Sequence, residues 1–306
     1  LSLGPELPAF ERALASYVGA AHAVAVNSGT SALHLCLDAV GVGEGDEVIT
    51  SPFSFIASAN CAQFVGARPV FVDIDPVTLN MDASRIADAV TPATKAILPV
   101  HVFGLPADMS AITSVAEESA LTVIEDACEA LGARVSGACA GTLGACGTFA
   151  FYPNKQITTG EGGMIVTDRA DIAERAVSLR NQGRDDGMGW LAHARLGYNY
   201  RISDINCALG RAQVGRLDDI LARREQVAEW YVQEFAGTLP EFVMPCAPPG
   251  GVTRSWFVFV VQLPAGSRQT ERDDLIAYLR ARGIGCNCYF PPIHLQPFYR
   301  ETFDYA

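Results

Sequence analysis

Apolar residues in the first part of the chain recur at spacings that indicate a helix, then a strand, then another helix. Phe10, Leu14 and Val18 stand four positions apart, which predicts an opening helix. The stretch AVAVNSGTSALHLCLDAVGV follows, and it predicts a strand that ends at Asn27, a tight turn and a helix over 32–40. The chain thus opens with the alternation typical of an α/β protein.

The same plan repeats further along. A strand over 47–50 and a strand over 69–73 flank a helix near 56–65. Three apolar strands and one intervening helix then follow in the order KAILPVHVFG, SAITSVAEES, LTVIEDACEALGA and GMIVTD. Alternating strands and helices predict an α/β fold in which helices cover both faces of a mostly parallel sheet. Ligands of such sheets gather at the carboxyl ends of the strands.

The pattern changes near position 216. A long charged helix, a Pro-rich loop, a strand and a second helix follow as LDDILARREQVAEWYVQEFAG, LPEFVMPCAPPGG, SWFVFVVQL and RDDLIAYLRARG. We therefore expect a large domain over 1–216 and a smaller α+β domain over 217–306.

Composition indicates a globular protein and argues against a membrane-spanning or nucleic-acid-binding one. The 306 residues are 49% hydrophobic, enough for a substantial core. Apolar runs stay well short of the roughly 20 residues that a membrane helix needs, and the N-terminal stretch lacks the features of a signal peptide. The net charge is −12 without a basic stripe, which argues against a nucleic-acid partner. We expect a cytoplasmic protein that is not bound to membrane.

The nine cysteines do not form a metal or disulfide pattern. One residue separates the closest pair, Cys286 and Cys288, and the sequence contains no CxxC. Buried, reduced thiols are the better interpretation. Histidine, cysteine and aspartate show no metal-ligand spacing either, so we predict no metal site.

Candidate chemistry centres on Lys155, in the stretch TFAFYPNKQITTGEGG. A lysine in a loop is most often an ordinary surface residue. Here, however, an aromatic approach predicts partial desolvation, which favours the neutral, nucleophilic amine. The glycines after Lys155 allow a ligand to approach the backbone closely. Asp126 stands at the end of the strand LTVIED, 29 positions before the lysine.

These features match the needs of pyridoxal phosphate. The cofactor forms an imine (Schiff base) with a lysine and needs a carboxylate opposite its pyridine nitrogen. Its phosphate needs backbone N–H donors at a helix start, which Gly29 and Thr30 offer. Phe55, after the second strand, can stack on the ring.

The sequence resembles the DegT/StrS-type nucleotide-sugar aminotransferases, within the aspartate-aminotransferase fold of pyridoxal-phosphate enzymes (fold type I). The resemblance spans nearly the whole chain. Its stretches are HAVAVNSGTSALHLCL, GDEVITSPFSFIASANCAQFVGARPVFVDID, VIEDACEALGA, FAFYPNKQITTGEGGMIVTD, LGYNYRISDINCALGRAQ and YFPPIHLQPFYR.

The resemblance implies specific roles. Lys155 would form the imine and Asp126 would face the pyridine nitrogen. Asn199, in GYNY, would contact the phosphate from a second subunit, which implies a homodimer with shared active sites. The cofactor-binding residues implied in this way are Gly29, Thr30, Phe55, Asp126, Glu129, Lys155 and Asn199.

Two positions depart from the family pattern. The family often has a phosphate-binding serine five residues before the lysine, where this chain has Ala150. Thr30, Asn199 or Thr148 would then carry more of the phosphate binding. Many members have Gln or His at the position of Glu129, where an acid beside the cofactor is unusual. The chain also stops before the family's last helices, so we expect an incomplete smaller domain.

Four further residues are candidates for substrate binding. His101 ends a strand at the expected pocket, and His294 resembles a position at which the family contacts the sugar nucleotide. Arg184 and Arg201 could clamp a diphosphate, because guanidinium groups suit phosphates. A structural loop role for His294 and interface salt bridges for the two arginines remain open alternatives.

The function implied is amino transfer from an amino acid, L-glutamate by expectation, to a nucleotide-linked keto-sugar. Pyridoxamine phosphate would carry the amine between the two substrates. The stretch YPNKQITTGEGG favours C4 of a 4-keto-6-deoxysugar, as in perosamine-type enzymes. Alternatives are a pyridoxamine-dependent sugar dehydratase, whose members lack the lysine, and a non-catalytic regulatory protein that binds the cofactor. The sugar, its nucleotide and the position aminated stay open.

Overall fold

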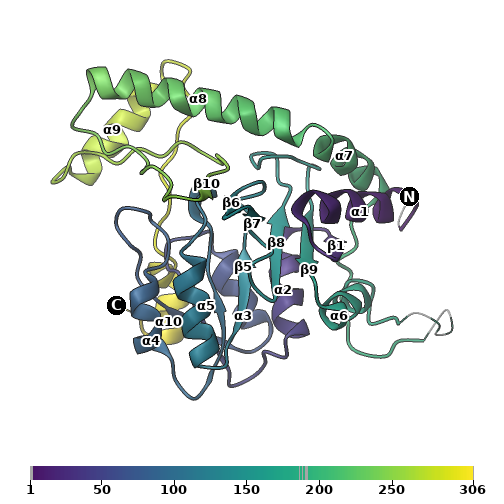
Figure 1. Cartoon of the computed structure of the whole chain (residues 1–306). Coiled ribbons are helices and arrows are strands. Elements are labelled where there is room, and N and C mark those ends of the chain that lie inside the picture. The colour runs from purple at the N-terminus through teal and green to yellow at the C-terminus, as the bar shows by residue number, and fades with distance from the viewer. Residues whose placement is uncertain (1–2, 186, 188, 190–191, 306) are drawn as a thin grey trace.

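A seven-stranded sheet forms the centre of the computed structural model, which describes residues 3–185, 187, 189 and 192–305 (Figure 1). Its strands, in spatial order, are β1 (His22–Val26), β9 (Gly163–Thr167), β8 (Cys146–Ala150), β5 (Thr122–Asp126), β4 (Thr94–Leu98), β2 (Glu47–Thr50) and β3 (Arg68–Phe71). Neighbouring strands are parallel, except that β9 is antiparallel to both β1 and β8. The expected α/β fold with a mostly parallel sheet is confirmed.

Helices cover both faces of this sheet (Figure 1). One face packs against α2 (Gly29–Ala39), α3 (Ala57–Phe64) and α6 (Ala170–Arg180). The other packs against α1 (Glu6–Val18), α4 (Ile86–Ala89), α5 (Met109–Glu118) and α7 (Asp204–Val214). In β2, Val48 packs into the core on the face covered by α2, α3 and α6. Its neighbour Ile49 packs into the core on the opposite face, because successive side chains of a strand point to opposite faces.

Boundaries follow the expectation closely. The helix expected over 32–40 begins at Gly29, because the Ser28 hydroxyl accepts the Ser31 N–H at 3.1 Å and caps the helix. Strand β8 and helices α6 and α7 were not among the elements expected from the pattern. The described residues also form the short 3₁₀ helices η1 (Ala83–Arg85), η2 (Val102–Gly104) and η3 (Ile293–Leu295).

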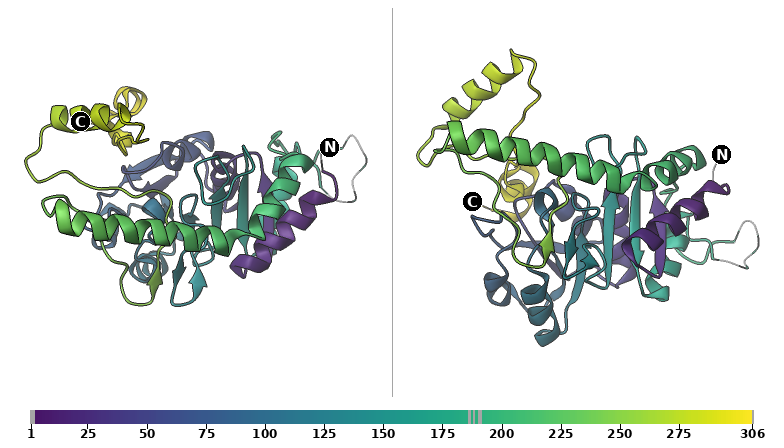
Figure 2. Two further views of the ribbon diagram at one scale, coloured as in Figure 1. Left: turned by 90° about the horizontal axis from the view of Figure 1, so that it is seen from above. Right: turned by 45° about the horizontal axis from the view of Figure 1, so that its top comes forward.

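The chain after residue 216 begins with a long helix, α8 (Leu217–Thr238), which runs along the top of the molecule in Figure 1. Figure 2 shows α9 (Gln269–Arg280) lying away from the central sheet, at the far end of α8. Helix α10 (Pro297–Phe303) packs back against α3, where the Tyr299 hydroxyl donates to Asn60 Oδ1 at 2.8 Å. A division into domains at residue 216 stays a prediction.

The strand expected over 255–263 is wrong. A strand needs a neighbour for its N–H and C=O groups, and among the described residues this segment has only an isolated bridge, between Gln262 and Val243. The Ser255 N–H donates instead to the Gly104 carbonyl at 2.9 Å. The nearby strand β10 (Val252–Thr253) joins β6 (Arg134–Val135) and β7 (Ala138–Cys139) in a small separate sheet.

Side chains occupy backbone groups on both outer strands of the large sheet. On β1, Glu11 Oε1 accepts the Ala25 N–H at 2.9 Å, and Arg180 Nη1 donates to the Ala25 carbonyl at 2.7 Å. Arg180 and Glu11 also pair with each other at 2.5 Å. On β3, the Tyr305 hydroxyl donates to the Pro69 carbonyl at 2.8 Å.

None of the described helices combines the length and apolar character that crossing a bilayer requires.

A buried carboxylate fixes the carboxyl end of β5. Glu125 is 0% exposed. Its Oε1 accepts the N–H groups of Leu143 at 2.5 Å and Gly144 at 2.7 Å, and its Oε2 accepts the Gly141 N–H at 2.7 Å and His101 Nε2 at 2.8 Å. Four donors therefore bind the two carboxyl oxygens of Glu125 and tie β5 to the loop before β8.

Replacing this carboxylate should destabilise the fold. In Glu125→Gln an amide N–H₂ would face protein N–H donors, so we expect a loss of about 3–5 kcal/mol in the free energy of unfolding. Urea denaturation measures the change. The control is Glu117→Gln on the exposed face of α5, which should stay within about 0.5 kcal/mol of the parent. A loss below about 1 kcal/mol for Glu125→Gln would contradict the assignment.

Candidate active site

A cavity of about 510 Å³ lies at the carboxyl ends of the parallel strands. Its lining comes from the start of α2, the turn before α3, the ends of β5 and β8, the turn after β8 and two segments beyond residue 250. This is the edge at which open α/β sheets bind ligands, and the volume is in the usual range for small molecules.

Lys155 reaches into this cavity from the turn after β8. Its side chain is 14% exposed, and Nζ lies 3.7 Å from Glu129 Oε1. The ring of Phe257 lies beside the amine, with its centroid 4.2 Å from Nζ. The aromatic, largely desolvated surroundings agree with those expected from the sequence.

Arg224 of α8 holds the lysine turn in place. Its Nη2 donates to the Lys155 carbonyl at 2.9 Å, and its Nη1 donates to the carbonyls of Trp256 at 3.1 Å and Phe257 at 3.0 Å. Burial lowers the pKa of this guanidinium. One side chain thus joins the lysine turn to the segment that supplies the Phe257 ring.

Asp126 ends β5 on the cavity wall and is buried. Its Oδ2 accepts the Ser58 hydroxyl at 2.6 Å, and its Oδ1 accepts the Cys128 N–H at 3.2 Å. The Ser58 hydroxyl also contacts the Ser54 hydroxyl at 2.7 Å. These bonds from α3 and from the end of β5 fix the orientation of the carboxylate.

Glu129 is a second buried acid of the cavity. Its Oε2 accepts the Phe103 N–H at 3.0 Å, and its backbone carbonyl accepts Gln156 Nε2 at 2.5 Å. Burial raises the pKa of Glu129, and the charge of Lys155 opposes that rise. The sequence departure at this position therefore places an acid directly beside the amine.

The first turn of α2 offers free backbone donors. Within the described part of the chain, the N–H groups of Gly29 and Thr30 have no acceptor, and both residues line the cavity. The positive end of the helix dipole adds to their attraction for an anion. A Cβ at Gly29 would stand 2.8 Å from Ala150 Cβ and 2.9 Å from Cys128 Sγ, so only glycine fits here.

The residues present fit pyridoxal phosphate. The cavity combines an amine, a buried carboxylate and unpaired N–H donors, the three groups that the cofactor requires. Ala150 lines the cavity without a hydroxyl, and Thr148 is fully buried with its hydroxyl directed to the Glu125 carbonyl at 3.4 Å. Among the described residues no group of histidine, cysteine or acidic side chains is placed to hold a metal ion.

Phe55 stands at the rim of the cavity and is 62% exposed. Tyr152 is also exposed there, and Phe257, Tyr289 and Phe290 supply further aromatic lining. Stacking of Phe55 on a cofactor stays a prediction.

His101 does not reach the cavity. It is 0% exposed; Nε2 pairs with Glu125, and Nδ1 accepts the Ala107 N–H at 3.0 Å. In place of the ligand contact expected from its position at a strand end, His101 is a buried structural residue. Both of its ring nitrogens are already used.

Asn199 and Arg201 also lie away from this chain's own cavity. Asn199 is exposed and forms an isolated bridge with Asn181. Arg201 donates to Asn181 Oδ1 at 2.9 Å and to Gln182 Oε1 at 2.8 Å. An exposed Asn199 is compatible with a contact to a second subunit, which stays a prediction.

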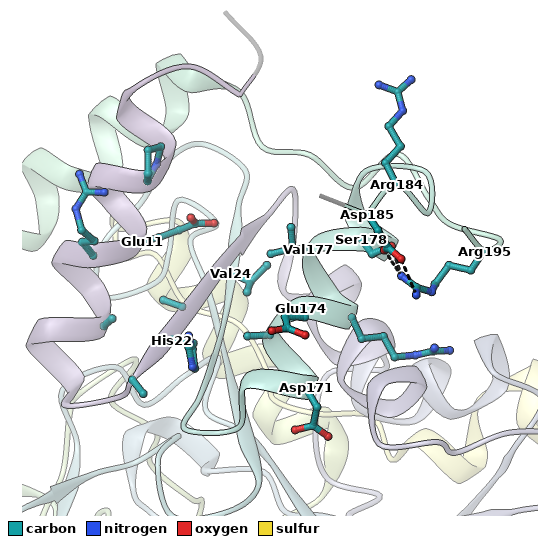
Figure 3. Close-up of a pocket in the computed structure, with 17 residues that line it drawn as sticks. Glu11, His22, Val24, Asp171, Glu174, Val177, Ser178, Arg184, Asp185 and Arg195 are labelled. Atoms are coloured by element: carbon teal, nitrogen blue, oxygen red, sulfur yellow. Dashed lines mark hydrogen bonds and ion pairs between the residues drawn. The ribbon is translucent and has the colours of Figure 1, made fainter. Parts of the chain in front are cut away.

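Arg184 and His294 line two other cavities. Arg184 borders a cavity of about 790 Å³ between α1, β1 and α6, where its side chain points away from the Arg195–Asp185 ion pair (Figure 3). His294 borders a cavity of about 500 Å³ beside β3, together with Arg68. The structure does not bring either residue to Lys155.

Several residues of the site have no counterpart among the sequence expectations. Ser58 could have been suggested by its spacing of four from Ser54 on a helix after a strand end. Phe257, Tyr289 and Arg224 carry no local signal, because they reach Lys155 only through long-range packing.

Comparison with known proteins gives related enzymes. A model of the DegT/DnrJ/EryC1/StrS aminotransferase family matches residues 1–306. A GDP-perosamine synthase from Caulobacter vibrioides is 45% identical over 298 residues, which are 97% of this chain and 80% of that protein.

Solved structures agree. The crystal structure of DesV from S. venezuelae has a TM-score of 0.91 at 38% identity, covering 98% of this chain and 79% of its own. Spr1654 from Streptococcus pneumoniae, solved in its PLP-form, has a TM-score of 0.93 at 27% identity. The match covers 99% of this chain and 82% of the Spr1654 chain.

Loss of the Arg224 contacts should loosen the lysine turn. Arg224→Met keeps the apolar stem but removes three hydrogen bonds from a charged group, each worth about 1.5–3 kcal/mol. We expect hydrogen exchange over residues 152–158 to quicken by at least about tenfold, measured by mass spectrometry. The matched control is Arg223→Met, one position earlier and exposed. Equal exchange rates in the two variants would contradict the role of Arg224.

Proposed function

This chain belongs to the DegT/DnrJ/EryC1/StrS aminotransferase family, and from that premise we propose that it transfers an amino group to a nucleotide-linked keto-sugar. It is a pyridoxal-phosphate-dependent aminotransferase. The proposed donor is L-glutamate, and the proposed acceptor carbon is C4 of a 4-keto-6-deoxysugar. The observation that carries the proposal is the meeting of the Lys155 amine, the Asp126 carboxylate and the start of α2 in one cavity.

We propose that Lys155 holds the cofactor by its aldehyde carbon and that Asp126 faces its ring nitrogen. The N–H groups of Gly29 and Thr30 would bind the phosphate, and Phe55 would stack on the ring. When bound, pyridoxal phosphate supplies a carbonyl carbon that accepts the amino group and a ring that withdraws electrons from the reacting carbon.

The chain's own residues would move protons and exclude water. Lys155, once its amine is free, lies where it can take a proton from the substrate carbon and return it. The bonds from Ser58 and Cys128 keep the Asp126 carboxylate in one orientation. Aromatic side chains beside the amine, such as Phe257, shield the reacting groups from solvent.

The acceptor is proposed from likeness. The relative at 45% identity is named for GDP-perosamine, an amino sugar linked to a nucleotide, which supports amination of a keto-sugar of this class. Lys155 argues against the dehydratase alternative, whose members lack this lysine. The presence of both Lys155 and Asp126 in the cavity argues against a protein without turnover.

We further propose a cytoplasmic homodimer in which Asn199 of each subunit completes the site of the other. The exposed position of Asn199 supports the dimer. The nine cysteines all lie within the described residues and are free thiols, as expected in a reducing compartment.

Amino transfer can be tested on the purified protein. With pyridoxal phosphate, L-glutamate should bleach the long-wavelength band of the lysine-bound cofactor. A panel of GDP-, dTDP- and UDP-linked 4-keto-6-deoxysugars should then yield an amino sugar detectable by mass spectrometry. Lys155→Ala should lose turnover by several orders of magnitude and remain folded. Lys95→Ala, at the other lysine of the sequence and exposed, is the matched control and should stay active.

Two outcomes would contradict the proposal. Activity above a few per cent of the parent in Lys155→Ala would show that another amine binds the cofactor. A protein that accepts none of the keto-sugars, while glutamate still bleaches the band, would be an aminotransferase for another class of acceptor.

The shared site can be tested by mixing variants. Lys155→Ala and Asn199→Ala subunits should each be weak alone. In their heterodimer one site carries both lesions and the other neither, so activity should return to roughly half of wild type per heterodimer. A mixture of Lys155→Ala with Lys155→Arg is the control and should stay inactive. If verified subunit exchange restores nothing, Asn199 does not act across the interface.

A further inference from the structure

A buried acid and a buried amine face each other inside the active-site cavity. Glu129 Oε1 lies 3.7 Å from Lys155 Nζ, and the two side chains are 8% and 14% exposed. Burial of a charge is costly unless an opposite charge compensates it. The protonation state of each side chain therefore depends on that of the other.

The fold holds Glu129 at this distance independently of the ion pair. The Phe103 N–H donates to Oε2, and Phe103 adopts a left-handed backbone conformation with φ 52° that non-glycine residues rarely adopt. Gln156, directly after Lys155, donates to the Glu129 backbone carbonyl. Both the acid and the lysine turn are thus anchored to the same hydrogen-bonded unit.

We propose that Glu129 stores the proton of Lys155, taking it when the amine must be neutral and returning it when the amine must be charged. The proposal rests on the proposed function for its use in the reaction. It does not rest on it for the proton exchange itself, which needs only that the Lys155 side chain bring Nζ from 3.7 Å to hydrogen-bond distance of Glu129 Oε1.

The transfer balances without another reactant. An N–H bond of the Lys155 ammonium breaks and leaves its electron pair on Nζ, while an O–H bond forms at Glu129 Oε1. The pair carries one positive and one negative charge before the transfer and no charge afterwards. Its net charge stays zero, so the buried cavity does not have to accommodate an uncompensated ion.

The surroundings favour this direction once Lys155 loses its charge. Burial is the largest effect that raises the pKa of Glu129, and the negative charge of Asp126 raises it further. The charge of Lys155 and the Phe103 N–H bond oppose this rise. The thiol of Cys128 and the hydroxyl of Tyr289 have raised pKa values, mainly through burial, so they remain protonated and are poor alternative acceptors. Other groups around the pair are the cavity residues Glu161 and Tyr152, and Arg224 at the Lys155 carbonyl.

The first test follows the amine itself. Lys95 and Lys155 are the two lysines of the sequence, so limiting acetic anhydride over a pH series, read by mass spectrometry, reports on each separately. We expect the pH at which half of Lys155 reacts to fall by about one to three units in Glu129→Gln, in the chain freed of cofactor. The pH at which half of Lys95 reacts should be the same in the parent and in Glu129→Gln. Glu161→Gln, at an exposed carboxylate of the same cavity, is the matched control and should leave Lys155 nearly unchanged.

The second test looks for the stored proton. The infrared difference spectrum between cofactor-loaded and cofactor-free chain should show a carboxylic-acid C=O band. This band should vanish in Glu129→Gln and persist in Glu161→Gln. Gln can still accept the Phe103 N–H, which favours folding; if Glu129→Gln nevertheless unfolds, Glu129→Asp should give a smaller shift of Lys155 labelling and keep an acid band.

Each result decides the proposal. An unchanged labelling profile in Glu129→Gln would show that the two groups are not coupled. A shifted profile with no acid band, or with a band that survives in Glu129→Gln, would reduce Glu129 to a simple ion-pair partner. Neither measurement uses a keto-sugar, so a failure of amino transfer would leave both results standing.

Discussion

The saturated carboxylate of Glu125 is the constraint on which the active site depends. Four donors hold it in the interior, and they come from the loop before β8 and from the segment after β4. Because adjacent residues of a strand face opposite sides, fixing Glu125 also fixes the direction of Asp126 on the cavity side. The Ser58 hydroxyl then completes the orientation of Asp126. The carboxylate of Glu125, to which we assign no chemical role, thus sets the position of Asp126, the carboxylate that we propose faces the cofactor.

Two glutamates at and after the end of β5, Glu125 and Glu129, illustrate how the same side chain serves different purposes. Each oxygen of the Glu125 carboxylate is held by two donors. Glu129 has one backbone N–H and one amine at the longer distance of 3.7 Å, so its charge depends on the state of its partner. Local hydrogen-bond supply, more than residue type, separates a structural carboxylate from a reactive one.

Much of the site could be predicted because its chemistry is local in the sequence. Lys155, Asp126 and Gly29 each stand at or shortly after the carboxyl end of a strand, and these ends of parallel strands lie at one edge of the sheet. His101 also follows a strand end, but its ring is hydrogen-bonded to Glu125 in the interior. The sequence around His101 contains no signal for this contact. The contacts of Lys155 with Phe257 and Arg224 depend on packing between distant segments. The segment over 255–263 has the apolar pattern of a strand but lacks a paired neighbour, and pattern alone cannot supply one.

The side chains on the outer strands have a consequence for behaviour in a crowded solution. An exposed sheet edge is a template on which a second chain can add a strand, and such addition leads to aggregates. Here the Glu11–Arg180 pair occupies both backbone groups of Ala25, and the Tyr305 hydroxyl occupies the Pro69 carbonyl. A strand added at β1 would have to displace the partly buried Glu11–Arg180 ion pair, and a strand added at β3 would have to displace the Tyr305 side chain. The large sheet is thereby guarded at both ends against templated growth.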